Sequence, residues 1–308
     1  MITAPMVSVV MGVYNGAATL RESVQSVLSQ DGVDFEFIIV DDGSTDASPA
    51  ILEQLSRGDR RIRIIRQENL GLTRALIRGC AEASGKYIAR QDCDDLSLPG
   101  KLKKELQAIE GRPDAALVSC GTRFVGPNGE LLYEISTAEG DATDGLLTLD
   151  PQRLRGPAGH GSTLFRRDLY ERVGGYREQF YFAQDLDLWT RLVEHGRHLV
   201  IPDVLYQVSV ALGSISSLQR DRQVACASVI LECARMRRAG LTEAPALAKA
   251  SAITRGSRKV EAADRAAALY FIGACLRKRR DPRARQYFVD ALRTYPLHLK
   301  SAVRILLG

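Results

Sequence analysis

Three short segments of the chain carry carboxylates that could do chemistry: Asp41-Asp42, Asp92-Cys93-Asp94-Asp95 and Asp185-Leu186-Asp187. In the middle segment three carboxylates lie within four residues, and they repel one another unless a cation sits among them. Carboxylate oxygens are hard ligands, which suit Mg²⁺ or Mn²⁺ bound together with phosphate oxygens. A solvated acidic turn is the alternative interpretation, and for an isolated pair of this spacing it is the commoner one.

The other two segments indicate recognition and proton transfer. The carboxylate of Asp42 can accept a hydrogen bond from an imide N–H, the group that uracil and thymine present. The alternative is a tight turn in which Asp46 caps the following helix. Asp185 precedes an apolar helical pattern, from which its carboxylate could act as a general base. Its alternative role is to cap that helix.

Short apolar runs that could position these groups alternate with amphipathic stretches over the first 120 residues. The predicted strands are Val7–Val13, Phe35–Val40, Arg61–Arg66, Lys86–Arg90 and Ala115–Cys120. Several are apolar at consecutive positions, which is typical of strands covered on both faces. The alternation predicts an α/β fold with a mostly parallel sheet and helices on both faces. Ligands bind beyond the carboxyl ends of such strands, where two acidic segments lie, and this favours a metal–nucleotide site.

The pattern changes after residue 120. Residues 126–129 predict a hairpin turn, and the glycine-rich residues 156–161 predict a loop. Two helices are expected at Arg167–Val173 and Leu186–Glu194. Beyond Asp221 the chain reads almost entirely as helix, with expected helices at Arg222–Ala239, Glu261–Arg280, Arg283–Thr294 and Leu297–Leu307. We therefore expect two domains, residues 1–220 and a basic α-helical region at residues 221–308.

The formal net charge of +5 conceals an uneven distribution. From Asp221 to the end there are 18 basic and seven acidic side chains, whereas residues 1–220 carry a net charge of −6. The densest basic stretch is Arg277–Arg280 with Arg283 and Arg285. Such a stretch is attracted to anionic lipid on a cytoplasmic leaflet, and a solvated helix end is the alternative. No nucleic-acid reader module accompanies the charge, so we do not expect a nucleic-acid partner.

The composition is that of a folded protein, with 45% hydrophobic and 26% charged residues. No apolar run approaches the ~18 residues that span a bilayer, and residues 1–13 lack the features of a signal peptide. The six cysteines show neither a CxxC pair nor a disulfide framework, which suits reduced thiols in the cytosol. We expect a cytoplasmic protein that is at most peripheral to the membrane.

A series of segments in this order resembles the motifs of family 2 glycosyltransferases: Val7–Asn15, Asp41–Ser44, Asn69–Leu72, Asp92–Asp95, Gly161–Arg167, Val173–Tyr176 and Gln184-Asp185. Each motif is short, but their order and spacing over about residues 5–220 are specific. The resemblance implies the Rossmann-like GT-A fold and a divalent metal, Mg²⁺ or Mn²⁺. It also implies transfer of a sugar, with inversion, from a nucleotide-sugar such as a UDP-sugar. The implied acceptor is a hydroxyl of a saccharide or lipid-linked saccharide in surface polysaccharide or glycan synthesis.

The resemblance further implies roles for the matching residues. The nucleotide-binding residues would be Gly12, Val13, Tyr14, Asp42, Asn69 and Asp92. Among them Tyr14 and Asp42 would contact the base, and Asp92 would hold ribose or metal-bound water. Asp94 would be the principal metal ligand. Asp185 would deprotonate the acceptor hydroxyl, and one carboxylate on the acceptor side inverts the sugar by direct displacement.

Two further residues are candidate contacts to the acceptor or to phosphate. They are His160, in the glycine-rich loop, and Trp189, in the helix that follows Asp185.

Two positions depart from the family pattern. Many relatives carry an arginine and a histidine after the base helix, but the segment Tyr206–Ser214 has neither. Gln184 stands where an acidic residue is commoner. One alternative is therefore a catalytically silent nucleotide-binding or scaffold protein of the same fold. A nucleotidyltransferase is another, although the glycines of Gly12–Gly16 are too sparse for the phosphate loop that such enzymes usually bring.

Overall fold

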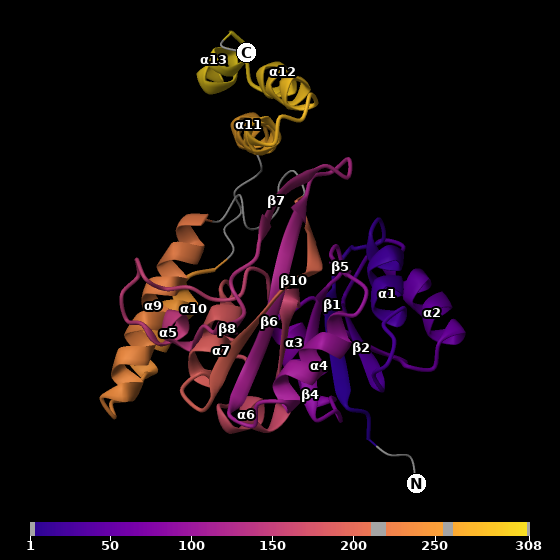
Figure 1. Ribbon diagram of the computed structural model, residues 1–308, viewed down its shortest axis with the longest axis vertical. Helices are drawn as coiled ribbons and strands as arrows, with labels where there is room; N and C mark the ends of the chain where they lie inside the picture. Colours follow the sequence, from indigo (N-terminus) through magenta and orange to yellow (C-terminus); the bar gives the residue numbers. More distant parts are fainter. Residues whose placement is uncertain (1–3, 211–219, 255–260, 307–308) are drawn as a thin grey trace.

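The computed structural model describes residues 4–210, 220–254 and 261–306. Residues 1–3, the first of the 13 that we compared with a signal peptide, lie outside the described residues. Leu307, the expected last residue of the final helix, also lies outside them. Figure 1 shows a central sheet flanked by helices, with three C-terminal helices gathered at one end of the long axis. Within the described ranges, no helix combines the length and apolar composition needed to span a bilayer.

The sheet has ten strands. They are β1 (Val7–Val13), β2 (Phe35–Asp42), β3 (Ile62–Gln67), β4 (Tyr87–Asp92), β5 (Leu96–Ser97), β6 (Ala115–Val125), β7 (Leu131–Ile135), β8 (Gly140–Asp141), β9 (Thr163–Arg166) and β10 (Arg197–Ser209). Their order is β3-β2-β1-β4-β9-β6-β10-β5, with β7 on β6 and β8 on β10. Strands β1 to β4 pair in parallel, and β9 runs antiparallel to both of its neighbours. The predicted α/β fold is confirmed.

Helices cover both faces of the sheet. On one face lie α1 (Leu20–Leu28), α2 (Ser48–Gly58) and α4 (Lys101–Glu110); on the other lie α3 (Leu72–Ala81), α6 (Arg167–Arg172) and α7 (Gln184–Leu192), with the short α5 (Thr143–Leu147) near α7. Successive strand residues point to opposite faces. In β1, Val9 and Met11 belong to the core on the side of α1, α2 and α4, whereas Val10 belongs to the core on the side of α3, α6 and α7. Because both faces are covered, the strands are apolar at consecutive positions.

Two strands run further than the apolar pattern predicts. Strand β2 continues to Asp42 and β4 to Asp92, so these carboxylates end strands and do not sit in turns. Only β1 separates them, since Gly12 pairs with Val40 on one side and with Asp92 on the other. The parallel sheet thus brings the first two acidic segments to one edge.

The C-terminal region is helical, as predicted. It contains α9 (Arg220–Arg238), α10 (Ala244–Ala252), α11 (Ala262–Lys278), α12 (Ala284–Thr294) and α13 (Leu299–Leu306). Helices α9 and α10 share a core with Phe180 and Phe182, which precede α7. Helices α11 to α13 form a separate core with Leu132 of β7. The boundary at residue 220 remains a prediction, and the helices beyond it attach to the sheet domain at two different places.

The predicted hairpin joins β6 to β7. The Gly126 N–H donates to the Glu130 carbonyl at 2.7 Å, and Gly129 adopts a φ of 78°, which favours glycine. Helix α12 is fixed to this hairpin by Tyr287, whose hydroxyl donates to the Glu130 carboxylate. The same hydroxyl accepts from the Asn128 amide at 2.8 Å.

Candidate functional site

The loops after β1 and β2 are held together by side chains at the sheet edge. The Asn15 side-chain oxygen accepts the N–H of Thr45 at 2.8 Å and that of Asp46 at 3.2 Å. Asp46 in turn accepts from Ser48 at the start of α2 and from Ala17. A turn thus follows Asp42, and Asp46 accepts the first N–H of α2, although Ala47 and not Asp46 occupies the N-cap position. These bonds leave Tyr14 46% exposed beside the edge.

Asp42 organises the next loop along the edge. Its carboxylate accepts the Gln67 amide at 2.7 Å and the backbone N–H groups of Leu70 at 3.0 Å and Gly71 at 2.8 Å. An ionised carboxylate has about four lone-pair positions, so three internal bonds leave one for a ligand. The same bonds draw Asn69 towards the ends of β1 and β2, because its chain neighbours are tied to Asp42.

The predicted nucleotide-binding residues Gly12, Val13, Tyr14, Asp42, Asn69 and Asp92 therefore share one edge of the sheet. Gly12 and Val13 are the last two residues of β1. Asn69 lies against Gly43, where an added Cβ would meet the Asn69 nitrogen at 2.7 Å. Their roles towards a nucleotide remain predictions.

A buried arginine fixes Asp92, the first carboxylate of the segment Asp92–Asp95, which we call the acidic loop. Arg90 is completely buried in β4. Its guanidinium donates to the carbonyls of Val10 and Gln91, both at 2.7 Å, and to Asp92 Oδ1. Three charge-assisted bonds hold this fork, so Asp92 Oδ1 is used within the protein and Oδ2 is left for other partners.

The other two carboxylates of the loop differ in exposure. Asp94 is exposed, yet the chain crowded around it and the Asp92 charge raise its pKa to about 6. Asp95 is buried and accepts the Ser209 N–H at 2.9 Å. Burial, followed by the Asp92 and Asp94 charges, raises the pKa of Asp95 well above its ordinary value. Both carboxylates thus resist ionisation in the absence of a neighbouring cation.

This donor set fits a divalent cation shared with a ligand. No group of three or more histidine, cysteine, aspartate or glutamate side chains within the described ranges could hold a metal ion by itself. Asp94 and the free Oδ2 of Asp92 are two hard donors, and Mg²⁺ in nucleotide sites usually has one or two carboxylates with phosphate oxygens and water. Two carboxylates at a phosphate-binding edge match that pattern.

Tyr206 of β10 supports the acidic loop by a hydrogen bond from within the core. It is completely buried, and its hydroxyl accepts the Asp92 N–H at 3.2 Å. The hydroxyl also bonds to the Asp95 side chain, which favours the ionised form of Asp95. Of the departing segment Tyr206–Ser214, residues 211–214 lie outside the described residues. Its described part supports the loop through Tyr206 and the Ser209 backbone.

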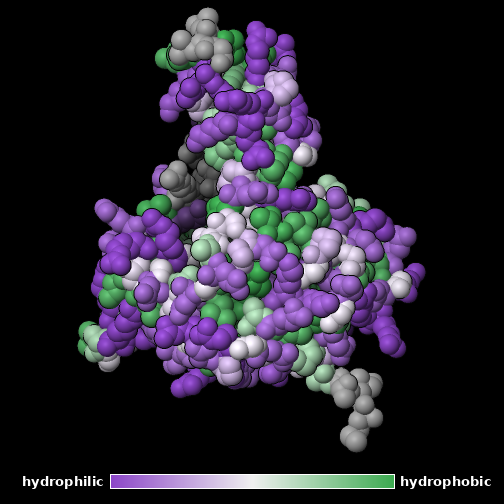
Figure 2. All heavy atoms as spheres, in the orientation of Figure 1, coloured by the Kyte–Doolittle hydropathy of each residue, from purple (hydrophilic) through white to green (hydrophobic). Residues whose placement is uncertain are grey.

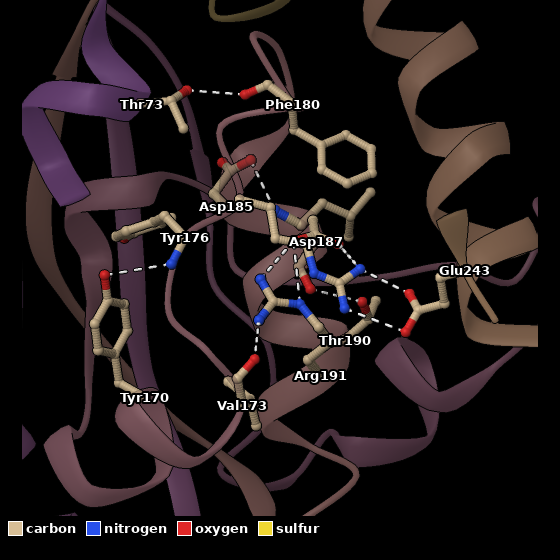
Figure 3. A network of polar contacts seen from close by, with 12 residues as sticks. Thr73, Tyr170, Val173, Tyr176, Phe180, Asp185, Asp187, Thr190, Arg191 and Glu243 are labelled. Atoms are coloured by element: carbon tan, nitrogen blue, oxygen red, sulfur yellow. Dashed lines mark hydrogen bonds and ion pairs between the residues drawn. The ribbon is translucent and has the colours of Figure 1, made fainter. Parts of the chain in front are cut away.

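Asp185 lies in the first turn of α7, which begins at Gln184, two residues earlier than predicted. Ala183 precedes the helix with a φ of 55° and occupies the cap position. The Asp185 carboxylate accepts the N–H of its neighbour Leu186 at 2.8 Å (Figure 3). Burial and the Asp92 charge raise the pKa of Asp185. A carboxylate with a raised pKa is suited to accept a proton near neutral pH.

Ion pairs fix the helix that carries Asp185. Asp187 is buried and bonds to Arg191 one turn later. Arg177 lies 3.6 Å from Asp187 and 2.7 Å from Glu243. Figure 3 shows Glu243 approaching from the side of α9 and α10 to close this network. The base candidate is thus held by groups from the C-terminal region.

His160 joins Arg90 at the centre of the site. Its Nε2 lies 2.6 Å from the Tyr176 hydroxyl and 3.4 Å from Arg90 Nε, which can only donate. Burial and the Arg90 charge lower the pKa of His160 well below its ordinary value. We assign a neutral ring with its proton on Nδ1. The nitrogen left for an acceptor or phosphate is therefore Nδ1.

Trp189 lies beside His160, with ring centroids 6.0 Å apart. It is only 3% exposed and belongs to the core between the sheet and α7. Its Nε1 is buried and has no hydrogen-bond partner among the described residues. The Trp189 side chain therefore packs in the core beside His160, and its contact with an acceptor remains a prediction.

Three residues of the site were not singled out from the sequence. Arg90 carried a signal, because a cation in an otherwise apolar strand lies two residues from Asp92 and so on the same face. Tyr176 lies in the motif Val173–Tyr176, but that motif did not indicate a contact with His160. Tyr206 carried no signal. Tyr206 is 114 residues from Asp92 in the chain, and only the pairing of β10 brings it near.

Comparison with known proteins relates the sequence to glycosyltransferases. The sequence profile of glycosyl transferase family 2 matches residues 8–174. A putative glycosyltransferase of Bacillus subtilis, EpsE, is 34% identical over 216 residues, which are 68% of this chain and 74% of EpsE. An uncharacterized glycosyltransferase of Methanocaldococcus jannaschii is 31% identical over 192 residues, 61% of this chain and 65% of that protein.

Two solved structures share the fold. S. aureus TarS 1–349 in complex with UDP-GlcNAc has a TM-score of 0.59 at 18% identity, over 94% of this chain and 89% of that one. The mannosyltransferase PcManGT of Pyrobaculum calidifontis, in complex with GDP-Man and Mn²⁺, has a TM-score of 0.59 at 20% identity. That match covers 99% of this chain and 88% of the mannosyltransferase.

Proposed function

Because the chain belongs to glycosyl transferase family 2, we propose that it is an inverting glycosyltransferase that uses a UDP-sugar or a related donor. The observation that carries the proposal is that β1 alone separates the strands that end in Asp42 and Asp92, while Asp185 lies near enough that, besides burial, the Asp92 charge raises its pKa. The UDP-GlcNAc complex of TarS and the GDP-Man complex of PcManGT support a nucleotide-sugar donor.

Donor binding is assigned to the edge formed by β1 and β2. The free lone pair of Asp42 would accept the imide N–H of uracil, and the exposed ring of Tyr14 would lie against the base. Gly12 and Val13, the last residues of β1, would lie against the nucleotide. Asp92 would accept from ribose or from metal-bound water through Oδ2, because Oδ1 is bonded to Arg90.

The proposed cofactor is Mg²⁺ or Mn²⁺, held by Asp94 and by Asp92. When bound, it would stabilise the negative charge that develops on the departing diphosphate. The protein's part is to hold the carboxylates in place through Arg90 and Tyr206. Burial, followed by the Asp92 charge, raises the pKa of Asp94, and a bound cation would favour its ionised form.

Asp185 is the proposed general base. One oxygen is bonded to the Leu186 N–H, and the other would take the proton of the acceptor hydroxyl as that oxygen attacks the anomeric carbon. The bond from the anomeric carbon to the diphosphate oxygen breaks as the new bond forms, so the sugar inverts. His160, whose Nε2 lies 3.4 Å from Arg90 Nε, would donate from Nδ1–H to the acceptor or to phosphate.

The proposed acceptor is a hydroxyl of a saccharide or lipid-linked saccharide, in surface polysaccharide or glycan synthesis. A lipid-linked acceptor would require the enzyme to work at a membrane, which the basic C-terminal region suits. We propose a cytoplasmic location, supported by six cysteines that are all free thiols.

Nucleotide binding tests the proposal first. Thermal unfolding is measured with UDP, GDP, CDP and ADP, each with and without Mn²⁺. Stabilisation by one diphosphate that requires the metal is the expected result, and indifference to every nucleotide would contradict it. Hydrolysis of a nucleoside triphosphate to pyrophosphate would instead favour a nucleotidyltransferase.

Asp185→Asn then separates binding from catalysis. The variant should bind donor as the native chain does, while transfer falls by about 10²–10⁴-fold because the general base is lost. Transfer at the native rate would remove Asp185 from the mechanism. Nucleotide binding without transfer in the native chain, tried with a range of acceptors, would favour the silent scaffold.

A further inference from the structure

A cavity of about 400 Å³ lies in the C-terminal helices, in a region that the proposed reaction does not use. Four arginines line it: Arg277 and Arg280 near the end of α11, Arg285 in α12, and Arg304 in α13. Phe288 and Ile305 add apolar surface to its wall. The cavity therefore combines concentrated positive charge with hydrocarbon.

The charge in this cavity is not neutralised from within the described part of the chain. The acidic residue in its lining is Asp281, which is bound by both ends of the Arg283 guanidinium. Arg277, Arg280, Arg285 and Arg304 have no carboxylate within ion-pair distance among the described residues. One nitrogen of Arg277, Nη1, is buried without any hydrogen-bond partner. A buried donor of this kind is stabilised when a ligand supplies the acceptor.

Arg280 occupies a backbone position that normally suits glycine. Its φ is 59°, the left-handed conformation at the end of a helix where a Cβ is unfavourable. The N–H of Asp281 closes the turn on the Leu276 carbonyl at 3.0 Å. A glycine would make this turn with less strain, so the arginine brings its guanidinium to the cavity at a cost in backbone conformation.

Exposed apolar residues accompany the cavity on α13. Leu299 and Val303, one turn apart, are 73% and 50% exposed, and Leu297 just before the helix is 71% exposed. Lys300 and Arg304 lie beside them on the helix. Figure 1 places α13 at one end of the long axis, and Figure 2 shows hydrophobic and hydrophilic surface side by side there. An apolar strip edged by cations is the pattern of a helix that lies in a membrane interface.

We propose that α11, α12 and α13 form a docking surface for an anionic phospholipid leaflet. The arginine cavity receives a lipid phosphate, because guanidinium groups bind phosphate oxygens in pairs. Leu297, Leu299 and Val303 enter the acyl boundary. A second protein would not explain, as directly as a phosphate does, four arginines around one cavity that have no carboxylate partner among the described residues. This surface is independent of the transferase assignment, since lipid binding requires neither donor nor acceptor.

Vesicle flotation of the full chain tests the proposal. The chain should float with vesicles of phosphatidylcholine mixed with phosphatidylglycerol and remain in solution with phosphatidylcholine alone. Replacing two of the four cavity arginines in Arg280→Gln/Arg285→Gln should weaken partitioning by about fivefold for each charge removed, which corresponds to one cation at an anionic surface. Leu299→Ser/Val303→Ser should also weaken it, although the charge is unchanged.

The matched control is Lys278→Gln/Arg279→Gln, which removes two charges from the same helix end outside the cavity lining. This control should lose clearly less partitioning into anionic vesicles than the cavity variant. Equal losses of partitioning would overturn the cavity as the binding site. Failure of the native chain to float would overturn membrane docking. Calorimetric binding of inorganic phosphate that depends on Arg280 and Arg285, without flotation, would instead assign a site for free phosphate. If the first cavity variant does not fold, Arg285→Gln/Arg304→Gln takes its place.

Discussion

Replacing Arg90 by methionine tests how the acidic loop is held. Methionine keeps most of the length and the apolar stem of the side chain but removes the charge. The change leaves Asp92 Oδ1 without its cation and the Val10 and Gln91 carbonyls without their donors. We expect both stability and donor binding to fall.

The expected loss of unfolding free energy follows from the burial of the pair. Removing one partner of a buried ion pair costs about 3–5 kcal/mol. The Arg90 side chain is fully buried, but that of Asp92 is 25% exposed, so water can solvate part of the abandoned carboxylate. Burying the methionine side chain offsets a further part. We therefore expect a loss near the lower limit, about 3 kcal/mol.

Urea unfolding measures this loss. The chain has one tryptophan, and Trp189 is buried beside His160, a direct neighbour of Arg90. Its fluorescence therefore reports on the region that the substitution perturbs. Arg63→Met is the matched control, because Arg63 is 47% exposed and pairs with Glu36 and Glu82 at the surface. It should lose no more than about 1 kcal/mol.

Equal losses of unfolding free energy in Arg90→Met and Arg63→Met would refute the conclusion that buried Arg90 fixes Asp92. Arg90→Lys adds a second comparison, since it keeps the charge but cannot reach three acceptors in a fork. It should lie between the native chain and the methionine variant in stability. Unchanged affinity of the methionine variant for a nucleotide with Mn²⁺ would show that Asp92 needs no fixed orientation to bind donor.

Three further predictions concern the metal, the glycine loop and the C-terminal helices. Divalent metal competes with a proton on Asp94, whose pKa is about 6, so affinity for Mn²⁺ should fall as pH drops through 6, by up to about tenfold per unit. Calorimetric titration at several pH values checks this, and a midpoint near 4 would contradict it. Gly161→Ala would place a Cβ 1.9 Å from the Tyr206 hydroxyl; we expect a loss of about 1–3 kcal/mol in urea unfolding, and a variant as stable as the native chain would refute the contact. Tyr287→Phe removes the hydroxyl that joins α12 to Asn128 and Glu130, which should cost about 1–3 kcal/mol, whereas Tyr295→Phe, at a tyrosine of the same region, should cost little.

Much of the fold could be predicted from the sequence, because a parallel sheet covered on both faces leaves a strong local pattern. Runs such as Phe37–Val40 are apolar at every position, and only burial on both sides makes that favourable. The strand ends were less predictable. Asp42 and Asp92 are polar and look like turn residues, yet both complete strands because neighbouring strands continue beside them.

The candidate site was predictable where chemistry depends on residue type and not where it depends on long-range packing. Asp94 could be proposed because clustered carboxylates repel one another without a cation. Asp185 could be proposed because it precedes an apolar helical pattern within a motif that resembles the family's. The support of Tyr206 could not be found, since a buried tyrosine in a strand looks like any other core residue. Nor does local sequence show that Glu243, in the C-terminal region, stabilises the helix that carries Asp185.

The ion pairs that join Asp187, Arg177 and Glu243 limit how far the chain can be shortened while Asp185 stays in place. The family profile ends at residue 174, before the base candidate, and the acidic body ends near residue 220. A chain truncated at residue 174 would lack Asp185 itself. One truncated at residue 220 would lack Glu243 and would expose Phe180 and Phe182, which α9 and α10 cover. The smallest fragment able to fold with Asp185 in place is therefore expected to extend through α10. Helices α11 to α13 pack in a separate core with Leu132, so we expect their exchange to leave the position of Asp185 unchanged.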